Sequence, residues 1–322
     1  MTNPIIANEL RTRFRGRFAA VGLTVWLVAV VGIGYLTYLL GLVQISQGGF
    51  GEVGNRALAG RAVYDWLILL VLTAVLVVVP AVAGLSVALE RDRATLPLLQ
   101  VSQLGAWGLV LGKWASSLLY VGVLLASAAP ILAVPVLLGG VGWGDLAATL
   151  GFLLLVVVSV GAISVWTSAR AKTLRGAIFG SYLWVFVLVV VTGALLLGEV
   201  LLLGDGRANP IGPDGREFVS VWANPYVGML SVLAEPVEAS DAADLRWRTL
   251  SGAAIDFFLQ RQPEQVRQQR FPDTESTRSP LWWRTVAIYL AMTPLALVGA
   301  ARSVRAPGKP DRFKARHKGA TS

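Results

Sequence analysis

Six long apolar stretches with at most one charged residue each constrain the fold of this chain more than any other feature. A helix of about 20 apolar residues crosses the roughly 30 Å hydrocarbon core of a bilayer. Each stretch is long enough to do so, and together they cover residues 19–43, 65–89, 108–138, 146–168, 176–203 and 281–301. We therefore expect an all-α polytopic membrane protein, with six transmembrane helices in a single transmembrane domain over residues 1–322.

The composition narrows the functions that such a chain can have. Only 15% of its residues are charged, whereas about a quarter are charged in a soluble protein. It has no cysteine and one histidine, His317, so the usual ligands of zinc and haem are missing. Asp65 and Lys113 lie near the ends of stretches, where a side chain can reach the membrane interface. The scarcity of ionisable residues deeper in the stretches argues against a secondary carrier.

Basic residues are distributed unevenly over the connecting segments. One set of connections holds 17 Lys and Arg, whereas the short connections 44–64 and 139–145 hold only two. The basic set comprises residues 1–18, 90–113, 169–175 and 302–322. Because Lys- and Arg-rich loops stay in the cytoplasm, we expect both termini inside, with 302–322 as a basic cytoplasmic tail.

With this orientation, we expect the long segment 204–280 on the extracytoplasmic side, with short helices in it. Asn224 and Pro225 favour the start of an apolar helix of about ten residues, since Asn caps helices and Pro suits the first helical position. That helix is too short to span the bilayer. A second, amphipathic helix is expected before Pro263, with Phe257 and Phe258 on its apolar face.

The N-terminal residues 1–18 are typical of a helix that lies in the membrane interface. Apolar residues recur every four positions, and arginines flank the stripe and face anionic headgroups. These residues are Ile6, Leu10, Arg11, Arg13, Phe14, Arg15 and Arg17. The alternative is a plain positive anchor that only fixes topology.

Residues 90–107 form a compact charged insert between the second and third stretches. Thr95 can cap a short helix in which Leu96, Leu99 and Gln103 share one face. A short amphipathic helix held below the membrane by two spans suits docking into a groove of another protein. The alternative is a connector whose charges serve insertion alone.

Two glycine motifs in the sequence differ in what they indicate. GLVLGKW at 108–114 fails as a phosphate-binding loop, because three residues rather than four separate its glycines and Trp114 replaces the hydroxyl residue. We therefore expect no nucleotide site, no cofactor and no enzymatic activity in the chain itself. Gly176 and Gly180 form a G-x-x-x-G pattern, which permits close helix packing.

In three regions the chain resembles the permease subunits of bacterial ABC-2 type ATP-binding-cassette transporters. NPIIANELRTRFRGR is similar to the connecting helix of that family, and ERDRATLPLLQVSQLGAWGLVLGK is similar to its coupling loop and the head of its third span. Six spans with a long fifth connection complete the likeness. The loop residues that match are Glu90, Arg91, Thr95, Leu96, Leu98, Leu99, Gly112 and Lys113. Pro97 departs from the pattern, since Glu is common there in the family.

The resemblance implies a permease subunit of an ATP-driven exporter in the bacterial cytoplasmic (inner) membrane. Its partners would be a second permease subunit, identical or related, membrane lipid, and a separate dimer of ATPase subunits that binds ATP and Mg²⁺; nucleic acid is not among them. The cargo would be amphipathic or hydrophobic. The residues expected to dock on the ATPase are Glu90, Arg91, Asp92, Arg93, Thr95, Leu96, Leu98, Leu99 and Gln103.

Two other functions compete with this interpretation. One is a secondary carrier or channel that works without an ATPase, which would require ionisable groups inside the membrane. The other is a non-transporting membrane subunit that docks the same kind of ATPase, which would be accompanied by a large folded outer domain.

Overall fold

In the part of the chain that the structure describes, all regular elements are helices. The structure is a computed structural model. It describes residues 17–46, 52–93, 105–137, 139, 141–202, 222–233 and 282–304.

Six helices in these ranges are long and apolar enough to cross a membrane, which confirms the six expected spans and a multi-pass membrane protein. The fifth is one continuous rod of two α-helical parts with a π-helical segment between them. The spans are α2 (Arg17–Ser46), α3 (Glu52–Gly84), α6 (Ala106–Leu137), α7 (Trp143–Arg170), α8–η1–α9 (Leu174–Phe186, Val187–Val191 and Thr192–Leu202) and α15 (Trp282–Val304). Two short helices accompany them, α4 (Ala88–Asp92) and α11 (Pro225–Leu233).

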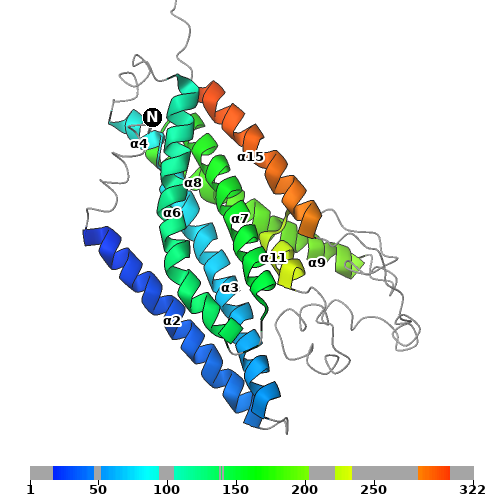
Figure 1. Ribbon diagram of the computed structural model, residues 1–322. Coiled ribbons are helices and arrows are strands. Elements are labelled where there is room, and N and C mark those ends of the chain that lie inside the picture. Colours follow the sequence, from blue (N-terminus) through cyan, green and yellow to red (C-terminus); the bar gives the residue numbers. More distant parts are fainter. Residues whose placement is uncertain are drawn as a thin grey trace, which may run out of the picture.

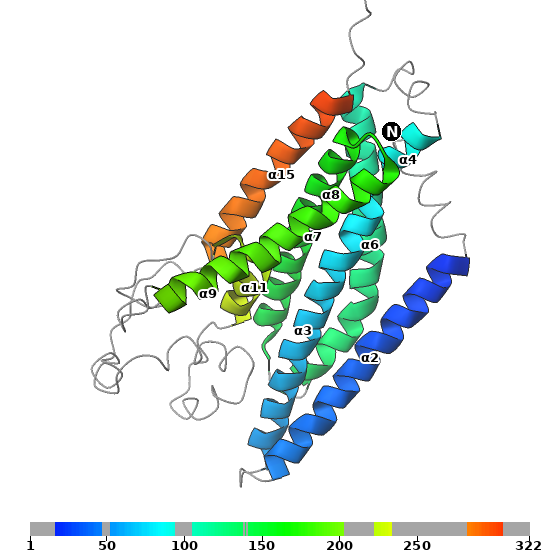
Figure 2. The ribbon, with the colours of Figure 1, turned by 180° about the vertical axis from the view of Figure 1, so that it is seen from behind.

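Helix α7 is the centre of the bundle. It packs against α3, α6, α8, α11 and α15, whereas α2 packs on α3 and α6. Helices α2 and α15 flank the bundle on opposite sides, and the N-terminal end of α2 diverges from the other spans (Figures 1 and 2). Its C-terminal end lies beside the start of α3. Helix α2 is the least buried of the six candidate spans, and about half of its described side chains are exposed.

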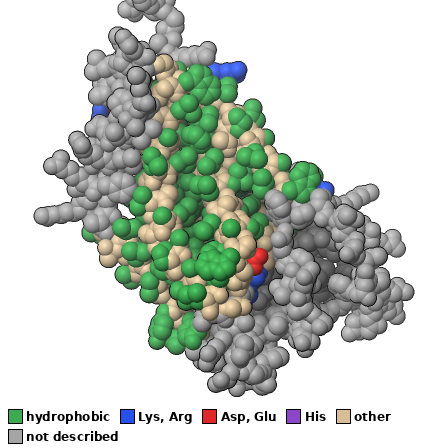
Figure 3. Space-filling model, viewed as in Figure 1, with side chains coloured by type: hydrophobic (Ala, Val, Ile, Leu, Met, Phe, Trp, Pro, Cys, Tyr) green, Lys and Arg blue, Asp and Glu red, His purple; other side chains and the backbone are tan. Residues whose placement is uncertain are grey.

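Two clusters of buried apolar side chains hold the spans together. The larger one joins α3, α6, α7, α11 and α15, and its most enclosed members include Tyr64, Leu67, Leu153, Met229 and Tyr289. The smaller one lies around Val87, Leu109, Ile163, Leu297 and Ala300. Outside these clusters the helices present apolar side chains to their surroundings, and the face in Figure 3 is largely hydrophobic with few charged side chains. Such a surface suits contact with lipid tails rather than water.

Small residues allow the closest helix contacts. A Cβ on Gly84 of α3 would lie 2.5 Å from Ser181 Oγ of α8. A Cβ on Gly299 of α15 would lie 2.5 Å from Trp166 Nε1 of α7. At both crossings the absence of a side chain is required for the observed approach.

Helix α3 differs from the expected second span at both ends. It begins at Glu52, so much of the expected connection 44–64 is helical. Arg61 continues that helix because it pairs with Asp65 one turn later, at 3.2 Å between Nε and Oδ1. At the other end the helix stops at Gly84, and a turn leads into α4.

Candidate functional site

The described part of the predicted coupling loop lies at one end of the bundle, which we call the basic end. This end is formed by α4, the starts of α6 and α8, and the last residues of α7 and α15 (Figures 1 and 2). Helix α4 lies at this end because the chain turns after Gly84, and it packs there against α8.

Ser168 of α7 fixes the start of α4. Its hydroxyl accepts hydrogen bonds from the backbone N–H of Val87, at 3.1 Å, and of Ala88, at 2.9 Å. The first N–H groups of a helix have no partner within that helix. Ser168 is buried and supplies the partner from another span. Sequence reasoning missed this residue, because nothing local distinguishes it from Ser159 and Ser164 in the same helix.

An ion pair connects α4 with α6. Lys113 Nζ donates to Glu90 Oε1 at 2.7 Å, with the Lys113 side chain 5% exposed and that of Glu90 24% exposed. Lys113 and Asp65 are both buried within the protein rather than exposed at its surface. Each has an oppositely charged partner in the protein, and pairing reduces the cost of burying a charge.

Arg91 connects α4 with the turn between α7 and α8. Its guanidinium donates to the carbonyl of Ala169 at 2.9 Å and also to the carbonyl of Ala171. Of the four charged residues at the start of the loop, Glu90 and Arg91 thus bind within the protein. Asp92 and Arg93 are exposed.

The other predicted docking residues lie outside the described ranges. They are Thr95, Leu96, Leu98, Leu99 and Gln103. The same holds for most of the predicted interfacial helix, namely Ile6, Leu10, Arg11, Arg13, Phe14 and Arg15. Arg17 is the first described residue of α2, whose candidate membrane span covers Val21–Leu39.

The two glycines of the G-x-x-x-G pattern lie in different surroundings. A Cβ on Gly180 would lie 3.7 Å from Thr167 Cβ of α7, so this glycine packs against another span. Gly176 is exposed, and its N–H donates to Thr173 Oγ1 at 3.1 Å as part of the start of α8. Of the two glycines, Gly180 therefore contributes to helix packing within the chain. The contact between Gly84 and Ser181 is closer than that of Gly180.

Toward the opposite end, α11 is inserted between α7 and α15. It begins at Pro225 after Asn224, as the sequence predicted. The Asn224 Oδ1 accepts from Tyr226 N at 2.9 Å. The same side chain donates through Nδ2 to the carbonyl of Val189, at 3.1 Å, and to Thr192 Oγ1, at 3.0 Å. Asn224 therefore caps α11 and also binds the π-helical segment of the fifth span.

Two further contacts join α3 to its neighbours at this end of the bundle. Arg61 of α3 donates to the carbonyl of Leu233, the last residue of α11. Tyr64 of α3 and Thr149 of α7 share a hydrogen bond of 2.6 Å between their hydroxyl oxygens. The i,i+4 spacing of Arg61 and Asp65 was a sequence signal for their ion pair, but not for the contact of Arg61 with Leu233.

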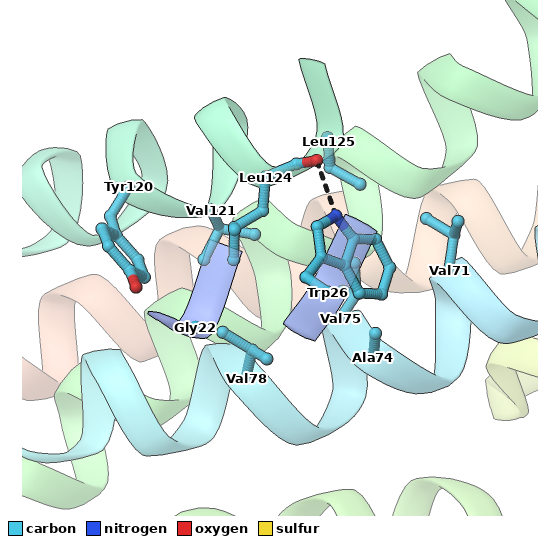
Figure 4. Close-up of a pocket in the computed structure, with 10 residues that line it drawn as sticks. All are labelled: Gly22, Trp26, Val71, Ala74, Val75, Val78, Tyr120, Val121, Leu124 and Leu125. Carbon is cyan, nitrogen blue, oxygen red and sulfur yellow. Dashed lines mark hydrogen bonds between the residues drawn. The ribbon is translucent and has the colours of Figure 1, made fainter. Parts of the chain in front are cut away.

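An apolar groove lies between α2, α3 and α6, within the spans (Figure 4). It has a volume of about 130 Å³. Trp26 crosses from α2 to α6 and donates through Nε1 to the carbonyl of Leu124 at 3.2 Å, while Tyr120 lies at one end of the groove. The lining residues are Gly22, Trp26, Val71, Ala74, Val75, Val78, Tyr120, Val121, Leu124 and Leu125. Such a groove accepts hydrocarbon rather than polar groups.

Comparison with known proteins gave no match, either to a protein-family model or to a curated protein. The fold and the apolar helices define the class, an α-helical multi-pass membrane protein. Within the described ranges, no three His, Cys, Asp or Glu residues gather into a possible metal site.

Proposed function

We propose that the chain is the membrane-spanning permease subunit of an ABC-2 type exporter, which pairs with a second permease and is driven by a separate ATPase. The observation that supports this most is the attachment of α4 to three other elements at the basic end. Ser168, Lys113 and Ala171 in the turn after α7 each bind it. In this proposal the basic end faces the cytoplasm and both termini lie inside.

The attachment gives a route for force. A push on the loop after α4 would act on α6 through Glu90 and Lys113, and on α7 through Ser168 and Arg91. Because α7 packs against most of the other spans, displacement of its end is distributed through the bundle. A loop without such contacts would absorb the displacement in its own backbone.

The membrane-level groove supports an amphipathic or hydrophobic cargo. Its lining is apolar, and one of its walls is α2, whose N-terminal end diverges from the other spans (Figures 1 and 4). A cargo with an apolar part could enter from the bilayer without losing hydrocarbon contacts.

The proposal is tested by capture of the ATPase. In the double variant Leu96→Ala, Leu99→Ala, two apolar anchors are truncated, and a central anchor typically contributes about 2 kcal/mol or more, roughly thirty-fold in affinity. We expect the affinity-tagged double variant to lose the ATPase while it still inserts and pairs. Arg93→Gln is the control, because an exposed rim charge contributes less. Retention of the ATPase by the double variant would contradict docking at this loop.

A secondary carrier has one observation in its favour, the burial of Asp65 inside a span. The ion pair with Arg61 and the bond of Arg61 to α11 favour a structural role instead. Asp65→Asn separates the two functions. If Asp65 has a structural role, the Asp65→Asn variant should have lower thermal stability and still bind the ATPase. If the protein is a carrier, the variant should lose transport at unchanged stability, and the native chain should transport without any ATPase.

A further inference from the structure

A basic hollow opens on the surface of the basic end. It has a volume of about 360 Å³ and is formed by three parts of the chain that are distant in sequence. Its lining residues are Arg91 of α4, Ala169 and Arg170 at the end of α7, Lys172 of the following turn, and Ser303 of α15. Three of these five residues are cationic, and the lining contains no carboxylate among the described residues.

Within the described ranges, no acidic side chain is paired with the cations of this hollow, which are Arg91, Arg170 and Lys172. Glu90, which precedes Arg91, is paired with Lys113 on α6. Cations around one concave surface attract an anion.

Two of the cations are held in place by groups that leave their charge unchanged. Arg91 binds the carbonyl oxygens of Ala169 and Ala171, which are neutral acceptors. The guanidinium of Arg170 lies over the ring of Trp166, 5.3 Å from its centroid. A guanidinium carries five N–H donors, so Arg91 retains donors after its two carbonyl contacts. The Ser303 hydroxyl donates to the Gly299 carbonyl at 2.8 Å and contributes shape rather than a free donor.

The position of the hollow indicates the kind of anion. The membrane-spanning regions of three helices end beside it, at Asp92, Arg170 and Val304. Side chains at the ends of spans lie at the level of lipid headgroups, where basic residues meet anionic lipid.

We propose that the basic hollow binds the phosphate of one anionic phospholipid of the cytoplasmic leaflet, through Arg91, Arg170 and Lys172. The bound headgroup would neutralise the junction of α4, α7 and α15. It would thereby stabilise the arrangement that the coupling loop acts upon. The binding site itself does not depend on the ATPase proposed above.

The test uses the purified full chain in detergent and phosphatidylglycerol as the probe, with phosphatidylcholine as the zwitterionic reference that has no net charge. Native mass spectrometry measures how many lipids are retained at each concentration. We expect one phosphatidylglycerol to be retained in preference to phosphatidylcholine. Lys172→Gln should weaken that binding about fivefold, and Arg170→Gln with Lys172→Gln about twenty-five-fold, since each cation near a membrane surface contributes about that factor.

Arg175→Gln is the matched control. Arg175 is exposed in the first turn of α8, at the same end of the bundle, but it does not line the hollow. Its loss should change phosphatidylglycerol binding by less than about twofold, because only diffuse attraction is reduced. Lys172 is exposed, so its substitution should leave the thermal midpoint unchanged in the absence of lipid.

Three results would overturn the proposal. Unchanged phosphatidylglycerol binding by the Lys172→Gln variant would remove the site from the hollow. Equal weakening by Arg175→Gln would mean diffuse attraction only. Full displacement by excess inorganic phosphate would assign the site to a free anion, because a lipid also held by its acyl chains resists such competition. None of these three results would contradict the capture of an ATPase by the loop, which is tested separately.

Discussion

Two ion pairs near the ends of the spans lie inside this protein, and the pair of Lys113 and Glu90 is the clearer case. Lys113→Met would leave the Glu90 carboxylate without its ammonium partner, 2.7 Å away in the native chain. Breaking a fully buried pair costs about 3–5 kcal/mol, and the partial exposure of Glu90 reduces this cost. We expect a loss of about 2–3 kcal/mol of unfolding free energy, measured by denaturant titration in detergent.

The control removes both charges. In the double variant Glu90→Gln, Lys113→Met, an uncharged amide replaces the unpaired carboxylate, so part of the lost stability should return. Stability losses that simply add would show that the two residues do not interact. Arg93→Gln, at an exposed position of the same segment, should change the free energy by less than about 0.5 kcal/mol.

Among the elements, the π-helical segment depends on a contact from another helix. Its Val189 carbonyl accepts from Asn224 Nδ2, which also binds Thr192. Asn224→Ala removes both this contact and the cap of α11, and we expect a loss of about 1–3 kcal/mol. Asn224→Asp keeps the capping oxygen but places a second oxygen against the Val189 carbonyl, so it should destabilise at least as much. Thermal midpoints in detergent measure both effects.

The two Asn224 variants separate two explanations. If Asn224 served only as a helix cap, Asn224→Asp would be as stable as the native chain, because Asp caps helices as well as Asn. Thr192→Val is a milder control. It removes one of the two acceptors and leaves the Val189 carbonyl bonded to Asn224.

The insertion of α11 into the bundle depends on a residue without a side chain. A Cβ on Gly228 would lie 2.7 Å from Phe152 Cζ and 2.8 Å from Thr285 Cγ2. Gly228→Ala should therefore cost about 1–3 kcal/mol from overpacking. Phe152→Leu should relieve part of this loss, so that the double variant is more stable than the sum of the single effects.

Gly122→Ala is the matched control for this substitution. Gly122 lies within α6, and a Cβ there would meet nothing within 4 Å. Because Ala favours helices over Gly, this variant should be neutral or more stable by up to about 1 kcal/mol. A similar loss in both variants would indicate a general effect of alanine and contradict close packing at Gly228.

The elements that hydropathy alone determines could be predicted from the sequence. All six spans and the start of α11 at Pro225 follow from apolar length and from the Asn–Pro pair. The extension of α3 back to Glu52 could not, because Arg56 and Arg61 resemble loop residues until the partner of Arg61 is known. The contacts of Ser168 and the second bond of Asn224 join residues distant in sequence, which a single sequence does not reveal.

For the whole molecule, the two ends of the bundle differ in charge. Among the described residues, Arg91, Arg170 and Lys172 gather at the basic end, where Lys113 is balanced by Glu90, in line with the expected concentration of Lys and Arg on one side. Arg61, at the opposite end, is paired with Asp65 and so adds no net charge. This asymmetry favours insertion with the basic end in the cytoplasm.

Cysteine labelling tests that orientation, because the chain has no cysteine of its own. We expect Ser240→Cys to react with a membrane-impermeant thiol reagent on intact cells, since residue 240 lies in the expected outer segment 204–280. Ser102→Cys and Ala320→Cys should react only after the membrane is permeabilised, because their segments carry the basic residues that remain inside. Reaction of Ser102→Cys on intact cells would place the coupling loop outside. An ATPase in the cytoplasm could then not reach it, and the proposed function would fail together with the orientation.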